Sequence, residues 1–175
     1  TAAKYDITRA EQDAYAIRSY QNTALNTENG VFSNEIVGVS VPQRRGEPRL
    51  ILEDEEYKNV KFEKIPQLRA AFSPTGTVTA ANASTMNDGA AALILASAAA
   101  VKKYDLKPLA KILSFADTAH EPAWFTTAPT HAAPKALALA KLAVTDVDYF
   151  EVNEAFSVVP LAFNKILNID INKVN

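Results

Sequence analysis

The chain has 175 residues, no cysteine, an apolar fraction of 48% and a formal net charge of -2 at pH 7. This apolar content is ample for a buried core and excludes a disordered chain. Lysines and arginines are scattered rather than massed, so we expect no nucleic-acid partner. The longest apolar run, Gly89 to Val101, is too short and too mildly apolar to cross a bilayer, so we expect no membrane association.

The absence of cysteine excludes disulfides, thiolate metal sites and a thiol nucleophile within these residues. Thr1 to Tyr5 has the pattern of a helix interior, without an initiator Met or a signal segment. The pattern at Lys173-Val174-Asn175 predicts the start of a further strand. These features predict a piece of a longer protein, in which any targeting segment would precede Thr1.

The first part of the chain is predicted to form a helix and a strand pair. Thr8 and Glu11 have the spacing of a capping box, which opens an amphipathic helix that ends near Asn29-Gly30. Alternating apolar residues in Glu35 to Val41, followed by a basic turn and the run Arg49 to Leu52, predict a hairpin-like pair of strands.

A charged segment follows the hairpin. The acidic run 53–56 precedes cations that alternate with apolar residues, namely Lys58, Lys61, Lys64 and Arg69. Such a pattern is typical of a solvated, charged face. The alternative is a cluster of cations that holds a phosphorylated ligand, because Lys and Arg are the natural partners of phosphate.

Small, uncharged residues dominate Gly76 to Ala92, which we call the small-residue segment. Small side chains let a ligand or a second backbone come close, and Asn87-Asp88-Gly89 has the chemistry of a tight turn. A tightly packed subunit or sheet contact is the structural alternative. After the turn we expect a buried strand over Ala90 to Leu95 and a short helix over Ser97 to Tyr104.

The last part of the chain has a βαβ rhythm. We expect strands over Leu109 to Phe115 and Val147 to Val152, a helix over His131 to Leu142, and a final helix after Asn153. Alternating strands and helices predict an α/β sheet covered by helices. The histidines, His120 and His131, have no evident partner, and surface or capping roles are favoured over catalysis for both.

Asn153-Glu154-Ala155-Phe156, which we call the Asn153 tract, joins the last predicted strand to the last predicted helix. A polar residue in this place lies where α/β sheets bind ligands and where backbone N–H groups favour developing negative charge. The structural alternative is that Asn153 caps the helix and Glu154 is an acid in its first turn. The tract alone leaves both interpretations open.

Four stretches, taken in order, resemble the thiolase family: Ile7–Asp13, Glu53–Lys58, Gly76–Leu95 and Phe150–Ser157. Within that family the chain resembles the acetoacetyl-CoA thiolases (acetyl-CoA C-acetyltransferases) of the eukaryotic mitochondrial branch. The resemblance implies the α/β thiolase fold, a layered αβαβα structure of two similar halves with an inserted loop domain that binds coenzyme A (CoA).

The same match divides the chain into three parts. Residues 1–72 correspond to the latter part of the CoA-binding loop domain, 73–103 to the end of the N-terminal half, and 104–175 to the start of the C-terminal half. The resemblance also implies a homo-oligomer, either a dimer or a tetramer, and a mitochondrial location with a cytoplasmic one as the alternative.

The activity that the resemblance implies is the reversible condensation of two acetyl-CoA into acetoacetyl-CoA and CoA. It proceeds through an acetyl-cysteine and uses a second cysteine as general acid and base. Both cysteines would lie outside this chain, which alone is predicted to be inactive. The alternatives are a 3-ketoacyl-CoA thiolase of fatty-acid degradation and a non-catalytic CoA-binding protein.

The resemblance also assigns site residues. Asn153 corresponds to the asparagine that orients a water in the oxyanion hole for the enolate. Substrate contacts correspond to Ser84 on the CoA chain, Ala155 and Phe156 along the acyl-pantetheine tunnel, and Asn59, Val60, Lys61 and Lys64 at the nucleotide. CoA and acetyl-CoA are substrates and no covalent cofactor is implied. A K⁺ ion is implied beside Tyr20 and the backbone carbonyls of Ala80, Ala81 and Ala83.

Overall fold

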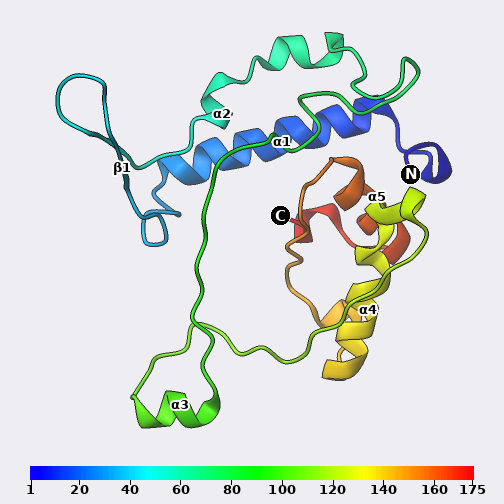
Figure 1. The fold of residues 1–175 in the computed structure, drawn as a ribbon. Helices are drawn as coiled ribbons and strands as arrows, with labels where there is room; N and C mark the ends of the chain where they lie inside the picture. The colour runs from blue at the N-terminus through cyan, green and yellow to red at the C-terminus, as the bar shows by residue number, and fades with distance from the viewer.

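The longest element of the computed structural model, which describes residues 1–175, is α1 (Arg9–Glu28), preceded by the 3₁₀ turn η1 (Ala3–Tyr5) (Figure 1). The predicted capping box is confirmed. The Thr8 hydroxyl accepts from the Glu11 N–H at 3.1 Å, and the Glu11 carboxylate accepts from the Thr8 N–H at 2.6 Å. The helix stops beside Gly30, whose φ of 71° lies in the left-handed region that glycine adopts without strain.

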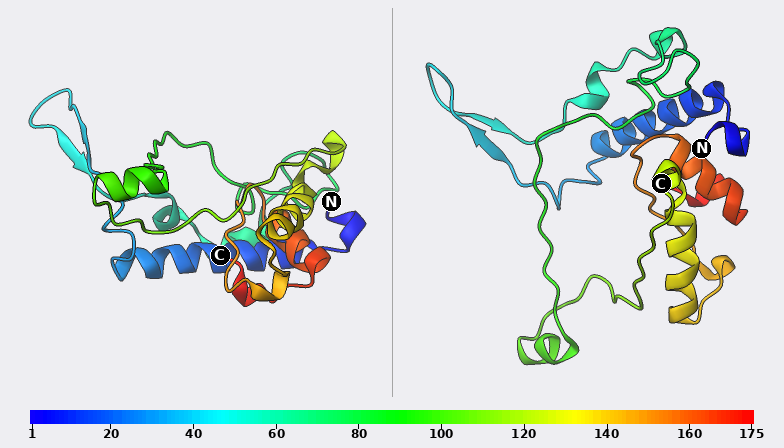
Figure 2. Two further views of the ribbon diagram at one scale, coloured as in Figure 1. Left: turned by 90° about the horizontal axis from the view of Figure 1, so that it is seen from below. Right: turned by 45° about the vertical axis from the view of Figure 1, so that its right-hand side comes forward.

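The predicted hairpin is confirmed, with shorter strands than expected. β1 (Val39–Val41) pairs antiparallel with β2 (Arg49–Ile51), and Ser40 lies opposite Leu50. The hairpin projects beyond the end of α1 (Figure 2). The chain then returns along α1 through α2 (Glu56–Asn59) and η2 (Phe62–Gln67), where Ile65 is buried to 1% exposure.

Residues between the small-residue segment and the C-terminal helices make a long excursion with α3 (Ala98–Lys103) at its far end (Figure 1). The predicted helix is confirmed, and Ser97 caps it by accepting from the Ala100 N–H at 3.1 Å. The predicted buried strand over 90–95 is wrong, as is the strand over 109–115, because both segments are extended, unpaired and exposed. A strand requires a neighbour that is hydrogen-bonded through its backbone, and neither segment has one; Ser114 only donates its hydroxyl to the Ala136 carbonyl of α4 at 2.6 Å.

The C-terminal part is mostly helical. It contains η3 (Pro122–Thr127), α4 (Pro129–Ala140), η4 (Val144–Asp146), α5 (Val158–Leu167) and η5 (Ile171–Lys173). The predicted helix over 131–142 is confirmed as α4, displaced toward Pro129, whose fixed φ suits a first helical turn. None of the helices has the length and apolarity needed to cross a membrane.

The strand predicted over 147–152 is wrong, because only Phe150 forms a bridge there, parallel to Val174. The final predicted helix is present as α5, but it starts only at Val158. Residues 151–157 are therefore irregular backbone, whose polar groups must find partners elsewhere.

The core lies on two faces of α5. Val159 and Phe163 pack with Val152 and Val174 on one face, while the second cluster on the other face consists of Ile7, Val158 and Ala162. The i, i+4 spacing of these residues places each pair on one side of the helix. This core fixes α5 against the N-terminal turn of the chain, and it fixes the Asn153 tract with it.

Candidate active site

The small-residue segment lies against the Asn153 tract as a short antiparallel bridge between Ala83 and Phe156. The Ser84 N–H donates to the Ala155 carbonyl at 3.0 Å, and the Ser157 N–H donates to the Asn82 carbonyl at 2.9 Å. The small side chains allow this close approach of two backbones, as the sequence indicated. Two segments that are far apart in the sequence therefore share one site.

Asn153 itself is exposed, and its side-chain amide has no partner within the chain. Ser157, not Asn153, occupies the N-cap position of α5. The interpretation of Asn153 as a helix cap is therefore wrong. An amide that is held on ordered backbone and has no internal partner is available to a ligand.

Glu154 is not a first-turn acid either, because it lies before α5 and faces α1. Its Oε1 accepts from the Tyr15 hydroxyl at 2.6 Å, and its Oε2 accepts from the Ser19 hydroxyl at 2.6 Å. The Asn175 amide also donates to Oε1, at 2.9 Å. Burial, followed by the hydrogen bond to Glu154, raises the pKa of Tyr15 above its ordinary value, so its hydroxyl stays protonated and donates.

Sequence reasoning missed this contact between Glu154 and α1. The available signal was the i, i+4 spacing of Tyr15 and Ser19, which puts two hydroxyl donors on one face of a helix. That signal is weak, because nothing in the pattern indicates which acceptor the face will meet.

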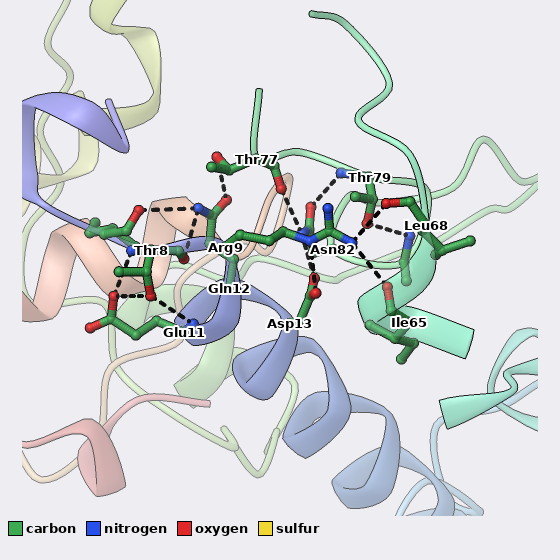
Figure 3. A network of polar contacts seen from close by, with 12 residues as sticks. Thr8, Arg9, Glu11, Gln12, Asp13, Ile65, Leu68, Thr77, Thr79 and Asn82 are labelled. Carbon is green, nitrogen blue, oxygen red and sulfur yellow. Dashed lines mark hydrogen bonds and ion pairs between the residues drawn. The ribbon is translucent and has the colours of Figure 1, made fainter. Parts of the chain in front are cut away.

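A polar network fixes the small-residue segment, which forms the other half of the site, to α1 (Figure 3). The Asn82 amide donates to the Asp13 carboxylate at 2.9 Å and accepts from the Thr79 N–H at 2.8 Å. Asp13 is also paired with Arg9 at 2.7 Å. Asn82 is 2% exposed, so its fully bonded side chain sets the course of the backbone that leads to Ser84.

Arg9 extends this network to η2. Its Nη2 donates to the carbonyls of Ile65, at 2.9 Å, and Leu68, at 3.0 Å. Gln12, which has no exposed surface, donates to the carbonyls of Ile7 and Thr8 at 3.4 and 3.1 Å (Figure 3). The stretch Ile7–Asp13 thus joins three segments of the chain through side-chain bonds.

Phe156 faces an apolar cavity of about 690 Å³. Its ring packs edge-on against Phe72 and Phe125, with both pairs of centroids 6.3 Å apart. Ala155 does not line this cavity, because it packs against the core cluster around Val152. An apolar hollow of this kind is suited to an acyl chain. Asn153 does not line it, but Phe156, three residues further on, does.

A second cavity, of about 640 Å³, lies on the Ser84 side of the bridge and is strongly acidic. It is lined by Ser84 and by six carboxylates, those of Glu53, Asp54, Glu55, Glu56, Asp88 and Glu154. The Ser84 hydroxyl donates to the Glu154 carbonyl at 2.7 Å. Tyr20, Ala81 and Ala83 also line this cavity, whereas Ala80 lies outside it. Burial, and then the charge of Glu56, raises the pKa of Tyr20.

The predicted nucleotide contacts lie apart from both cavities, from the last residue of α2 to the first turn of η2. Lys61 and Lys64 are exposed and form no ion pair, while the Asn59 amide donates to the Glu55 carbonyl at 3.0 Å. Val60 is half-buried. The neighbouring Lys58 is neutralised by Glu53 at 2.6 Å, so Lys61 and Lys64 supply the available positive charge.

The histidines lie close together, contrary to expectation. The rings of His120 and His131 have centroids 4.9 Å apart, and the Thr127 hydroxyl lies 3.4 Å from His120 Nε2. Periodicity could not show this pair, because the turn η3 folds the loop before α4 back onto the helix. Both rings lie outside the two cavities.

Within these residues the only sheet is the β1–β2 hairpin, so the predicted helix-covered α/β sheet is not formed by this chain alone. Comparison with known families makes the assignment. Residues 1–99 match the thiolase N-terminal domain, and residues 106–175 match the thiolase C-terminal domain. The chain belongs to the thiolase family.

Three relatives illustrate the similarity. The chain is 52% identical to an acetyl-CoA acetyltransferase of Schizosaccharomyces pombe, over 99% of this chain and 44% of the relative. It is 52% identical to a mitochondrial acetyl-CoA acetyltransferase of Bos taurus, over 100% and 42%. It is 49% identical to a cytosolic one of Gibberella zeae, over 98% and 43%. The chain therefore spans less than half the length of these relatives.

Solved structures show the same fold. A thiolase of Ascaris suum in complex with coenzyme A matches with a TM-score of 0.92 and 45% identity, over 99% of this chain and 44% of that one. An acetyl-CoA acetyltransferase of Bacillus anthracis matches with a TM-score of 0.94 and 36% identity, over 99% and 44%. The predicted thiolase fold is confirmed, and the unpaired extended segments follow the course that this fold gives them.

Proposed function

We propose that the full-length subunit is an acetyl-CoA acetyltransferase that condenses two acetyl-CoA reversibly into acetoacetyl-CoA and CoA. The observation that carries the proposal is the Asn153 amide, which is exposed, has no internal partner and stands three residues before Phe156, a residue that lines the apolar cavity. The names of the relatives support the same activity.

The reaction would run through an acetyl-cysteine, and these 175 residues contain no cysteine, so the proposal concerns the full-length subunit. One cysteine thiolate attacks the carbonyl of the first acetyl-CoA, and the bond to sulfur of CoA breaks to release the CoA thiolate. A second cysteine removes the α-proton of the next acetyl-CoA. The resulting enolate carbon attacks the acetyl-cysteine carbonyl, and the carbon–sulfur bond breaks to release the thiolate. Asn153 orients a water that donates to the enolate oxygen as its negative charge develops.

Substrate binding is assigned to three places. Ser84 contacts the CoA chain, while Ala155 and Phe156 form a wall of the acyl-pantetheine tunnel. Asn59, Val60, Lys61 and Lys64 meet the nucleotide, where two unpaired lysines suit its phosphates. The apolar cavity beside Phe156 and the similarity to the Ascaris suum thiolase, which was solved in complex with coenzyme A, support this part of the proposal.

A K⁺ ion is proposed beside Tyr20 and the carbonyls of Ala80, Ala81 and Ala83. Oxygen ligands and the acidic lining of the neighbouring cavity suit a hard cation.

We also propose the division into residues 1–72 of the loop domain, 73–103 of the N-terminal half and 104–175 of the C-terminal half. A homo-oligomer and a mitochondrial location complete the proposal, with the cytosolic relative supporting the alternative location.

The decisive experiment measures thiolysis of acetoacetyl-CoA by CoA with the full-length subunit. We expect turnover, and we expect Asn153→Ala to lower kcat about 100-fold, as the loss of one oxyanion-hole donor does. A subunit that binds CoA without turnover would contradict the proposal and favour the non-catalytic alternative. Faster cleavage of a C8 than a C4 ketoacyl-CoA would favour a degradative 3-ketoacyl-CoA thiolase instead.

A further inference from the structure

We infer that Tyr15 and Ser19 of α1 are positioning residues for the enolate step, acting through Glu154 on the orientation of Asn153. The inference rests on the proposed function, because it gives Asn153 a task. It adds to the proposed site two residues of α1 that do not touch the substrate.

The geometry is specific on the α1 side. Tyr15 and Ser19 are one helical turn apart, and each donates to a different carboxylate oxygen of Glu154 at 2.6 Å. A carboxylate held at both oxygens cannot rotate about its terminal bond. The two hydroxyls therefore fix the position and the plane of the Glu154 side chain against a helix of 20 residues.

The Tyr15 donor is itself well held. Tyr15 is 5% exposed, and the Arg18 guanidinium lies 4.8 Å from the centre of its ring. A buried, ordered hydroxyl loses little further entropy when it forms its bond, so the contact with Glu154 is rigid rather than occasional.

Asn153 takes its orientation from its neighbours in the chain. Before it, Val152 is 5% exposed, and its N–H and carbonyl are bonded to the Asn175 side chain at 2.7 and 2.8 Å. After it, Glu154 is held by α1, and Ala155 is bonded to Ser84. The Asn153 side chain has no bond of its own, so the backbone on its two sides decides where the amide points.

Small errors of placement are costly at such a site. A donor stabilises an enolate only when it lies at hydrogen-bonding distance from the developing charge, and a displacement of about 1 Å lowers the rate strongly. Loss of the Tyr15 or Ser19 hydroxyl would leave Glu154 with only one of its two donors from α1, beside the Asn175 amide, and would widen the range of positions that Asn153 adopts. The CoA contacts proposed at Ser84 and Phe156 would remain.

The test uses the full-length subunit and a double-mutant cycle in acetoacetyl-CoA thiolysis. We expect Tyr15→Phe to lower kcat about tenfold, with KM for acetoacetyl-CoA changed less than about twofold. In an Asn153→Ala background the same substitution should lower kcat by less than about twofold, because the group on which it acts is gone. Ser19→Ala should behave in the same way, with a smaller loss of kcat. It replaces Tyr15→Phe in the cycle if that variant does not fold.

Conservative variants separate positioning from charge. Glu154→Gln keeps the reach of the side chain and one acceptor oxygen for Tyr15, and its NH2 group can donate to the Ser19 hydroxyl oxygen in place of the accepted bond. We therefore expect it to retain most of kcat, whereas Glu154→Ala should lose nearly as much as Asn153→Ala. The matched controls are Tyr5→Phe and Ser33→Ala, which remove hydroxyls that bond to nothing in the chain and should leave kcat unchanged.

The outcomes separate the two proposals. A wild-type subunit without thiolysis, or an Asn153→Ala variant with full kcat, would overturn the proposed function and this inference with it. If the wild type is active and Asn153→Ala is slow, three results would overturn the inference alone. The first is a Tyr15→Phe variant with unchanged kcat, and the second is a Tyr15→Phe effect on kcat that is equally large in the Asn153→Ala background. The third is a Glu154→Gln variant as slow as Glu154→Ala.

Discussion

Two regions of the molecule have similar apolar sequence patterns but differ in how far their side chains are buried. One is the region around α1 and α5, and the other is the excursion that carries α3. Phe163 is 2% exposed and Val159 is 5% exposed in the first region, whereas Phe115 is 83% exposed and Ile94 is 94% exposed in the second. In the first region, side chains and backbone groups meet partners from distant parts of the chain. In the second, the extended backbone makes no backbone hydrogen bond to another segment (Figure 1).

An apolar pattern thus describes what a segment is able to bury, while contact with a second segment decides whether it does so. Around α1, the partners are supplied by side chains such as Arg9, Asp13 and Glu154, which bond across long sequence separations. The one side-chain hydrogen bond of residues 86–96 is local, from the Asn87 amide to the Thr85 hydroxyl at 2.7 Å. Stability within this chain should therefore be concentrated around α1 and α5.

The most direct test of this contrast is the same substitution in both regions. Phe163→Ala removes a ring from the cluster around Val152 and should lower the free energy of unfolding of the 175-residue chain by about 4 kcal/mol. Phe115→Ala should change it by less than about 0.5 kcal/mol. Urea unfolding followed by circular dichroism measures both, and equal losses would refute the contrast.

The polar network gives the next largest effect. Asp13→Ala should cost about 3 kcal/mol in the same assay, because it removes the carboxylate partner of Arg9 and one of the two acceptors of the buried Asn82 amide, the other being the Thr77 carbonyl. Asp148→Ala removes an exposed carboxylate that bonds to nothing and is the matched control. A loss no larger than that of the control would show that α1 is not held by this network.

The capping box gives a smaller, pH-dependent effect. Thr8→Ala should cost about 1 kcal/mol at pH 7, and Thr145→Ala, at an exposed threonine without a bond, should cost nothing measurable. Hydrogen bonds from the Thr8 side chain and N–H lower the pKa of Glu11 in the folded state.

The sign of the pH effect follows from that lowered pKa. The stability that the Glu11 carboxylate contributes is present above its ordinary pKa and is lost as the pH falls through the lower, folded-state value. The difference in unfolding free energy between wild type and Glu11→Gln should therefore shrink as the pH falls from about 5 to 3. A difference that grows over this interval would contradict the assignment.

The smallest effect is expected in the excursion. Ile94→Thr should change the unfolding free energy of this chain by less than about 0.5 kcal/mol, because the side chain is 94% exposed. Hydrogen exchange adds a second measurement, since backbone amides of 90–95 should exchange at nearly the rate of an unfolded peptide while those of α5 are protected. Protection of 90–95 equal to that of α5 would show that the two regions do not differ in this way.

Local signals were sufficient for much of the fold. The Thr8 and Glu11 pair placed the start of α1, and alternation around a basic turn placed the hairpin, because capping and turn chemistry act within a few residues. Ser97 marked the start of α3 for the same reason. The strands over 90–95, 109–115 and 147–152 were wrong, because strand formation needs a partner that periodicity does not reveal.

The candidate site, like the fold, could be predicted only in part from the sequence. The sequence pointed to the Asn153 tract and to the small-residue segment, since a polar residue between two elements and a run of small side chains are both visible locally. It did not reveal that these two segments form one bridge, that Glu154 turns toward Tyr15, or that His120 faces His131. Each of these contacts joins residues whose relation depends on how the intervening chain folds.

Residue types and short spacings were enough to specify the helix caps, the hairpin, the thiolase resemblance and the asparagine on which the proposed chemistry depends. Backbone preference and side-chain chemistry act directly at that range. The side chains that hold the asparagine became visible only in the folded chain, because α1 brings Tyr15 and Asp13 to two segments that lie far away in the sequence. The position of Asn153 is thus set by long-range hydrogen bonds and packing around α1 and α5, which no local pattern encodes.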